Sequence, residues 1–219
     1  MTDVKFCGLT RAQDAQLAES HGATFVGVIL AGGPRLVDLS QARQILGDRR
    51  EGVQRVAVFG DEPMDRLLTT ADTLDLDVVQ LHGDPTPAFI EALRARSVRA
   101  LWPVLRVDGG TLHESALGLA EAAGALVLDA KVVGQLGGTG VSLDWHALAG
   151  AVQQLRAAVP VFRLILAGGL RPDNVGRAIA LLQPDVVDVS SGVESAPGLK
   201  DPVAVARFVS AVHAAQRNT

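Results

Sequence analysis

The chain has a single cysteine, no tyrosine and two methionines, and aromatic residues make up only 4% of it. One cysteine excludes an intramolecular disulfide, and the five histidines lack the spacing of a zinc site. No apolar run approaches the roughly 20 residues that span a bilayer, and the N-terminus lacks the basic and apolar segments of a signal peptide. We therefore expect a cytoplasmic protein that binds neither a metal nor a membrane.

An excess of positive charge is also missing. The 20 lysines and arginines are outnumbered by 24 acidic residues, and the net charge is −4. This balance gives no support for a nucleic-acid partner, so an anionic substrate has to be held by a few local groups. The 219 residues, 48% of them apolar, predict one compact domain that spans residues 1–219.

Short runs of Val, Ile and Leu recur along the chain and predict eight strands. Most are apolar throughout, as in parallel strands that are covered on both faces, and the gaps between them are long enough for helices. The runs occupy residues 4–7, 24–30, 53–59, 78–81, 98–104, 125–129, 164–167 and 186–190.

Helix signals fall in the gaps between these runs. Thr10, three residues before Gln13, predicts a capping box, and Thr86 and Asp201 each precede a proline at the first helical position. Asp61, two residues before Pro63, suggests a similar start. Alanine-rich segments predict further helices at residues 112–123, 143–158 and 203–215. Eight strand-then-helix units are typical of a (β/α)₈ barrel, and a doubly wound open sheet is the alternative.

In such a barrel the chemistry lies at the carboxyl ends of the strands. Cys7 ends the first run, His82 follows the fourth and Asp129 ends the sixth. Cys7 is either a reactive thiol or a buried apolar residue, and Asp129 is either a general acid or a turn cap. His82 either orients a substrate or packs at the rim. Arg35, after the second run, suits a carboxylate, or is an ordinary solvated arginine.

Glycine-rich turns follow the last strands, where such barrels bind phosphate through backbone N–H groups and a short extra helix. Gly168 and Gly169 follow the seventh run, Ser191 and Gly192 follow the eighth, and residues 193–196 could form the helix. Residues 131–140 form a long, glycine-dense loop that is either a lid or an ordinary surface loop.

Several segments together resemble the phosphoribosylanthranilate isomerase family of tryptophan biosynthesis, and the likeness runs in order along essentially the whole chain. Each glycine motif alone is weak evidence for the family, whereas the first and last segments together are specific to it. The segments are KFCGLTR at 5–11, QLHG at 80–83, LD at 128–129, GGTG at 137–140, LAGGLRPDNV at 166–175 and VDVSSGVE at 187–194.

The resemblance implies an Amadori rearrangement of N-(5′-phosphoribosyl)anthranilate to 1-(2-carboxyphenylamino)-1-deoxyribulose 5-phosphate, without a metal or organic cofactor. By this resemblance Asp129 protonates the ring oxygen and Cys7, as thiolate, takes the C2′ proton. Because an ordinary cysteine with a pKa of ~8.5 is mostly protonated at pH 7, the site has to lower this pKa or work with a small thiolate fraction.

The resemblance also assigns binding residues. It implies that Arg35 holds the anthranilate carboxylate and that Asp188 helps to orient the substrate. Family members include monomers and dimers, and we expect a monomer. The residues that it implies for the phosphate pocket are Gly138, Gly168, Gly169, Ser191 and Gly192.

Two positions depart from the family pattern. Gly33 stands where members often have serine, and Arg171 replaces the usual capping residue, which costs the following helix ~1 kcal/mol unless Arg171 lends charge to the phosphate. The rival functions are the related isomerase of histidine biosynthesis, another sugar-phosphate barrel, and a catalytically silent barrel that binds a phosphorylated ligand or a protein. Histidine-pathway relatives pair two aspartates, so Cys7 argues against them.

Overall fold

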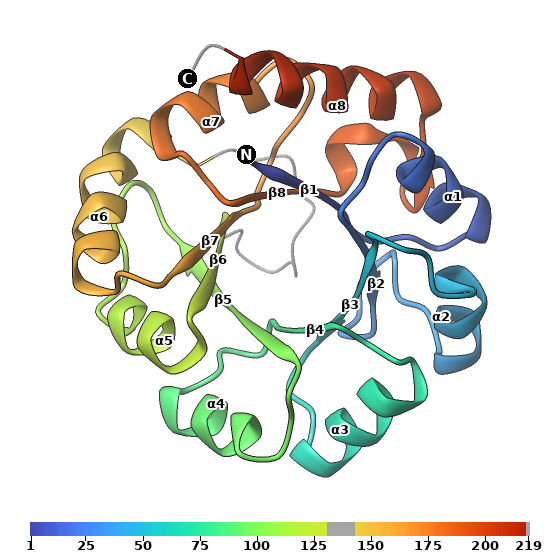
Figure 1. Ribbon diagram of the computed structural model, residues 1–219, viewed down its shortest axis with the longest axis horizontal. Coiled ribbons are helices and arrows are strands. Elements are labelled where there is room, and N and C mark those ends of the chain that lie inside the picture. The colour runs from blue at the N-terminus through green and yellow to red at the C-terminus, as the bar shows by residue number, and fades with distance from the viewer. Residues whose placement is uncertain (131–142, 218–219) are drawn as a thin grey trace.

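The computed structural model describes residues 1–130 and 143–217. Eight parallel strands close into a barrel in chain order, because β1 pairs with both β2 and β8, and helices surround the barrel (Figure 1). The predicted (β/α)₈ barrel is confirmed and the open sheet is wrong. The strands are β1 (Asp3–Phe6), β2 (Phe25–Ile29), β3 (Gln54–Phe59), β4 (Val78–Leu81), β5 (Ala100–Val107), β6 (Ala125–Ala130), β7 (Arg163–Leu166) and β8 (Val186–Val189).

A helix follows each strand, and the strand runs are apolar because both of their faces are covered. The helices are α1 (Ala12–Ser20), α2 (Leu39–Leu46), α3 (Met64–Thr73), α4 (Pro87–Arg94), α5 (Ser115–Ala123), α6 (Trp145–Ala158), α7 (Val175–Leu182) and α8 (Pro202–Gln216). The buried apolar strand residues alternate between the core that the helices share and a separate cluster inside the barrel. Phe25 and Trp102 meet there, with ring centroids 4.9 Å apart.

The helix starts confirm some capping predictions and correct others. The side chains of Thr86 and Asp201 cap α4 and α8 as predicted. The Thr10 capping box is wrong, because the Thr10 hydroxyl donates to the Gly198 carbonyl at 2.7 Å and α1 starts after Arg11 without a side-chain cap. Helix α3 likewise has no side-chain cap at Pro63.

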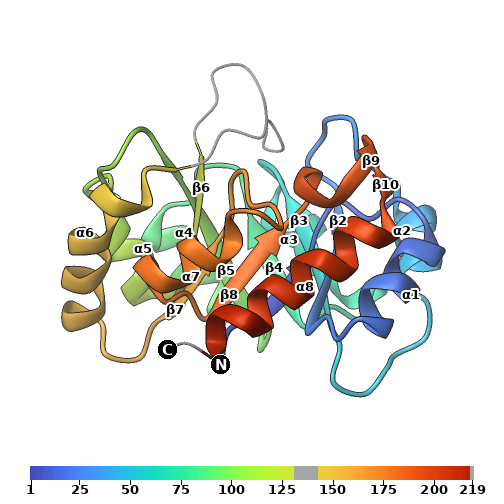
Figure 2. The same ribbon diagram turned by 90° about the horizontal axis from the view of Figure 1, so that it is seen from above.

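The segment after β8 also differs from the prediction. A 3₁₀ turn covers Ser191–Val193, but the next residues form strand β9 (Glu194–Ala196), which pairs antiparallel with β10 (Leu199–Lys200). This hairpin lies on the side of the barrel where the strands end, opposite the start of the chain (Figure 2). The short helix expected at 193–196 is therefore wrong, and a hairpin stands beside the barrel mouth instead.

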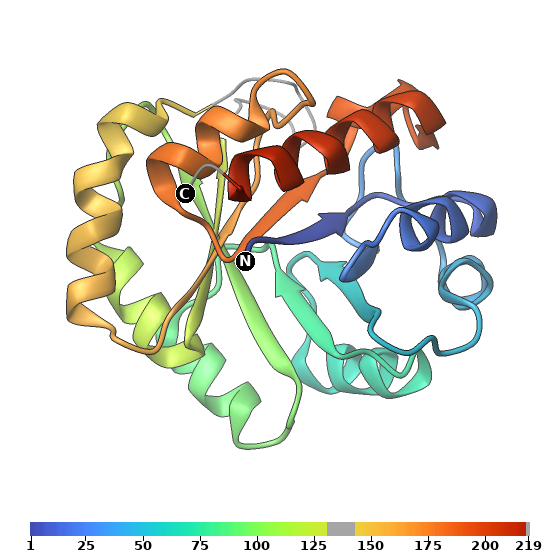
Figure 3. The same cartoon turned by 45° about the horizontal axis from the view of Figure 1, so that its top comes forward.

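The start of β1 lies beside the end of α8 (Figure 3). The Gln216 side-chain amide donates to the Thr2 carbonyl at 2.6 Å and ties the two segments together. Among the helices of residues 1–130 and 143–217, none is long and apolar enough to cross a membrane.

Candidate active site

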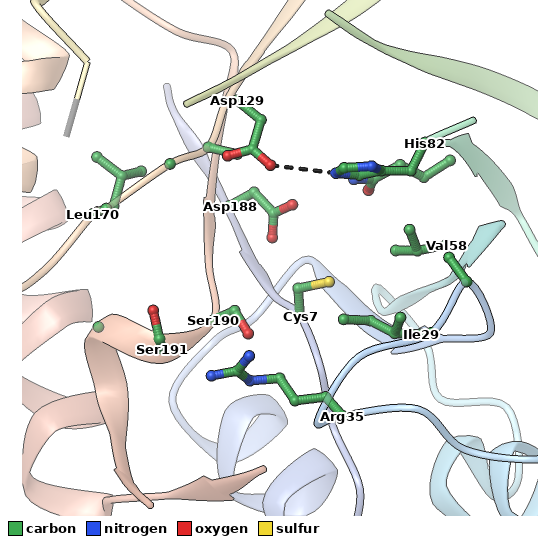
Figure 4. A pocket seen from close by; sticks show the side chains of 17 residues that line it. Cys7, Ile29, Arg35, Val58, His82, Asp129, Leu170, Asp188, Ser190 and Ser191 are labelled. Carbon is green, nitrogen blue, oxygen red and sulfur yellow. Dashed lines mark hydrogen bonds and ion pairs between the residues drawn. The ribbon is translucent and has the colours of Figure 1, made fainter. Parts of the chain in front are cut away.

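A pocket opens at the carboxyl ends of the strands and brings together residues from all parts of the chain (Figure 4). Nine of the ten predicted site residues line it, and the tenth, Gly138, lies outside the described residues. The nine are Cys7, Arg35, His82, Asp129, Gly168, Gly169, Asp188, Ser191 and Gly192.

Cys7 directly follows β1, and its backbone N–H donates to the Val189 carbonyl at 2.9 Å, which holds it against β8. Its side chain faces the pocket but is buried, with the residue only 6% exposed. Burial raises the pKa of the Cys7 thiol above its ordinary value, and the nearby Lys5 ammonium opposes this rise. Of the two alternatives for Cys7, a lowered pKa or a small thiolate fraction, the raised pKa favours the second.

Lys5 is a functional candidate that the sequence analysis missed. It lies in β1 two residues before Cys7, so both side chains are directed to the same face of the strand. Its fully buried ammonium is 2.7 Å from the Asp188 carboxylate. Burial alone would lower the pKa of Lys5, but Asp188 and Cys7 raise it above its usual value, which keeps the ammonium charged. The sequence does contain a signal for this residue, because a single lysine inside the apolar run at 4–7 is unusual and indicates a functional side chain.

Asp129 lies near the end of β6 and is held by His82, whose Nε2 is 3.3 Å from Asp129 Oδ2. Arg106 Nη2 donates to the His82 carbonyl at 2.8 Å and lies 3.4 Å from Nδ1. Because a guanidinium only donates, this contact favours the tautomer in which Nδ1 accepts and Nε2, next to Asp129, carries the proton. His82 therefore orients the Asp129 carboxyl group.

Arg35 is 7% exposed and lines the pocket from the loop after β2, so the solvated alternative is wrong. Its guanidinium makes a bidentate contact with Glu194 of β9, with Nε 2.8 Å and Nη2 2.6 Å from the carboxylate oxygens. The sequence analysis did not identify Glu194 as part of the site.

The two glycine-rich loops pack closely at one side of the pocket. A Cβ on Gly192 would lie only 1.8 Å from the Leu170 carbonyl oxygen, so the approach of these loops requires glycine. Asn174 closes the first loop by accepting from the Arg171 N–H at 2.7 Å and donating to the Gly169 carbonyl at 2.9 Å. It makes no side-chain cap on α7, and the Arg171 guanidinium pairs with Asp173 at 3.1 Å.

Three buried polar atoms in the pocket have no hydrogen-bond partner among residues 1–130 and 143–217: Gln80 Oε1, Asp188 Oδ1 and Ser190 Oγ. Buried polar groups are normally paired, so atoms of this kind suit the hydroxyl groups of a ligand. Gln80 was not predicted as a site residue, although a glutamine inside the apolar run at 78–81 was a usable signal. Within the described part of the chain, no cluster of His, Cys, Asp and Glu could hold a metal ion.

A closed parallel barrel with a polar pocket at the carboxyl ends of its strands defines a (β/α)₈-barrel enzyme. The family model for "N-(5′phosphoribosyl)anthranilate (PRA) isomerase" matches residues 4–211. The chain therefore belongs to this family and is an isomerase of tryptophan biosynthesis.

Individual relatives agree with this assignment. The chain is 42% identical over 214 residues to N-(5′-phosphoribosyl)anthranilate isomerase of Magnetococcus marinus, with 97% of this chain and 96% of the relative covered. The enzyme of Citrifermentans bemidjiense is 41% identical over 213 residues, with 96% of each chain covered.

Solved structures extend the similarity to three dimensions. The crystal structure of phosphoribosyl anthranilate isomerase from Thermotoga maritima matches with a TM-score of 0.86 and 31% identity, covering 98% of this chain and 100% of that one. A second structure, of a phosphoribosyl anthranilate isomerase in complex with reduced 1-(o-carboxyphenylamino)-1-deoxyribulose 5-phosphate, matches with a TM-score of 0.82 and 30% identity over 98% of this chain and 100% of that one.

Proposed function

We propose that the protein converts N-(5′-phosphoribosyl)anthranilate to 1-(2-carboxyphenylamino)-1-deoxyribulose 5-phosphate, with Asp129 as the general acid and Cys7 as the general base. The observation that supports this proposal is that the Cys7 thiol and the Asp129 carboxyl group, far apart in the chain, line one pocket that also contains two glycine-rich loops and a buried arginine.

Ring opening is the first step. Asp129, in its carboxylic-acid form, donates a proton to the ribose ring oxygen while the amino nitrogen supplies the electron pair that breaks the C1′–O bond. The product is an open-chain Schiff base with a positively charged nitrogen. The hydrogen bond with His82 fixes the orientation of the carboxyl group for this transfer, although a donor at Oδ2 by itself favours the carboxylate, so the acid form has to be present when the substrate is bound.

Proton removal from C2′ is the second step. The Cys7 thiolate takes the proton, the C2′ electron pair forms the C1′–C2′ double bond, and the nitrogen becomes neutral. The enol then loses its hydroxyl proton as C1′ gains one, which yields the ketose. The raised pKa of Cys7 limits the thiolate fraction, whereas Lys5 favours the thiolate and the charged nitrogen acidifies the C2′ proton.

Substrate binding uses the rest of the pocket. Arg35 holds the anthranilate carboxylate. Asp188, Gln80 and Ser190 orient the substrate, because their unpartnered oxygen atoms suit the ribulose hydroxyl groups. The phosphate is bound mainly through backbone N–H groups. The residues proposed for the phosphate are Gly138, Gly168, Gly169, Ser191 and Gly192. Every step transfers a proton, so the chemistry requires no cofactor.

The direct test is turnover of freshly generated N-(5′-phosphoribosyl)anthranilate by the purified protein, followed by the loss of substrate fluorescence. The corresponding aminoaldose of histidine biosynthesis serves as the control substrate. We expect turnover of the anthranilate compound alone. A folded protein that leaves it unchanged would refute the proposed reaction, and turnover of both compounds would indicate a broader enzyme.

A further inference from the structure

Glu194 is a buried carboxylate whose contacts the proposed reaction does not use. It lies at the start of β9 with its side chain 4% exposed, and it holds Arg35 through both carboxylate oxygens. Burial alone would raise the pKa of Glu194, but the hydrogen bonds from Arg35 and Lys200 hold it below its usual range. Glu194 is therefore a carboxylate at neutral pH.

Lys200 holds this carboxylate from the second strand of the hairpin. Its Nζ lies 2.7 Å from Glu194 Oε1, 2.8 Å from the Cys7 carbonyl oxygen and 3.0 Å from the Ser190 carbonyl oxygen. Burial lowers the pKa of Lys200 and the Glu194 carboxylate opposes this shift; because the three acceptors use all three hydrogens of an ammonium group, we assign the charged form to Lys200. Two cations and one anion leave the group of Arg35, Glu194 and Lys200 with a net charge of about +1.

The contact with Glu194 determines which edge of Arg35 remains available. Nε and Nη2 are bound to the carboxylate, whereas Nη1 has no hydrogen-bond partner among the described residues. The remaining Nη1 and Nη2 hydrogens form the end of the guanidinium fork, which suits a second carboxylate. Gly8 fixes the path of the side chain, because its φ is +68° and a Cβ there would lie 2.5 Å from Arg35 Cδ.

We propose that Glu194, anchored by Lys200, is a positioning residue that holds the free edge of Arg35 toward the pocket and so makes the enzyme specific for a substrate with a carboxylate at that place. This inference rests on the proposed function, since it concerns how that substrate is selected. The competing explanation is that Glu194 only ties the β9–β10 hairpin to the barrel. A purely structural contact would affect substrates with and without the carboxylate equally.

The test compares N-(5′-phosphoribosyl)anthranilate with N-(5′-phosphoribosyl)aniline, which lacks the carboxylate. In Glu194→Gln we expect the ratio of the two kcat/KM values to fall at least roughly tenfold, mainly through KM, because the charge-assisted contact that orients Arg35 is lost. Charge alone predicts the opposite, since removal of an anion beside the pocket favours an anionic substrate. An unchanged or increased ratio would therefore overturn the positioning role.

Four further variants complete the experiment. Arg35→Ala should abolish the preference, and adding Glu194→Gln to it should lower the ratio no further. Ser195→Ala, the exposed next residue of β9, is the matched control and should keep the wild-type ratio. Glu194→Asp retains the negative charge beside Lys200 but has a shorter side chain that reaches less far toward Arg35, so it should also lower the ratio. This variant replaces Glu194→Gln in the test if Glu194→Gln does not fold.

The outcomes separate the two proposals. Absence of turnover of either compound by the folded wild-type protein contradicts the proposed function. Wild-type preference for the anthranilate compound that is lost in Arg35→Ala but kept in both folded Glu194 variants contradicts the positioning role alone.

Discussion

The two ends of the barrel use their polar side chains in opposite ways. At the amino end, Asp77 and Asp185 directly precede strands and accept the backbone N–H groups of Arg55 and Leu164 in the neighbouring strands, at 2.8 and 2.7 Å. At the carboxyl end, buried atoms of Gln80, Asp188 and Ser190 lack partners among the described residues. These two carboxylates at the amino end stabilise the chain itself, whereas the unpartnered atoms at the carboxyl end are available to a ligand.

Among substitutions at the two ends of the barrel, Cys7→Ala is expected to have the largest effect on activity. Loss of a general base should lower kcat at least ~100-fold. Binding of the reduced product analogue should stay nearly intact, because the phosphate and carboxylate contacts remain. Rates of substrate fluorescence loss and calorimetric binding of the analogue check the two parts. Near wild-type turnover would remove Cys7 from the mechanism.

Lys5→Met should have the next largest effect on activity. When proton removal from C2′ limits the rate, the wild-type rate should rise with pH up to the raised pKa of Cys7, because the thiolate is the reactive form in that step. Removal of the ammonium that opposes the burial effect should raise this pKa further. At pH 7 the rate should then fall roughly tenfold for every pH unit by which the pKa of Cys7 rises, because the thiolate fraction falls by the same factor.

The check on Lys5 is a pH–rate profile of both proteins, with circular dichroism confirming that the variant is folded. Because the change leaves Asp188 unpaired, the Lys5→Met/Asp188→Asn double variant serves as a second background. An unchanged profile in both backgrounds would show that Lys5 does not affect the base.

At the opposite end, Asp185→Ala should reduce stability and leave the chemistry intact. The Leu164 N–H loses its acceptor, and residue 164 is fully buried, so the free energy of unfolding should fall by about 1–3 kcal/mol. Urea denaturation measures this change, and kcat should equal that of the wild type well below the unfolding transition. A lower kcat in the folded variant would mean that the two ends are coupled.

Arg171→Ala is expected to have the smallest effect on activity and stability. Arg171 lies at the protein surface, next to the first of the two glycine-rich loops. The Arg171 side chain is about half exposed and pairs with Asp173, so its loss should change the free energy of unfolding by less than ~1 kcal/mol. We expect KM to stay at the wild-type value. A large rise in KM would show that Arg171 supplies charge to the phosphate, as the sequence alone left open.

The barrel and much of the site could be predicted because their signals are local. Parallel strands buried on both faces are apolar throughout, and residues at strand ends must meet at the barrel mouth. Cys7 and Asp129 were found in this way. Helix α2 was missed although its signal is also local, since Asp38 and Gln41 form a capping box.

The remaining features depend on contacts between distant segments. Thr10 bonds to Gly198 instead of capping α1, and Glu194 enters a strand because β10 follows the turn at Pro197 and Gly198. Arg35 and Glu194 are separated by 159 positions, so nothing in either neighbourhood indicates the pair. The pKa of Cys7 was uncertain for the same reason, because burial and Lys5 act in opposite directions there.

The most direct test of the difference between the two ends is Asp129→Asn, with turnover and the free energy of unfolding measured on the same sample. Asparagine keeps the size of the side chain but cannot supply the proton for ring opening. We predict that turnover of N-(5′-phosphoribosyl)anthranilate falls at least ~100-fold while the free energy of unfolding stays within about 1 kcal/mol of the wild-type value. Turnover close to wild type, or a loss explained by unfolding, would contradict it.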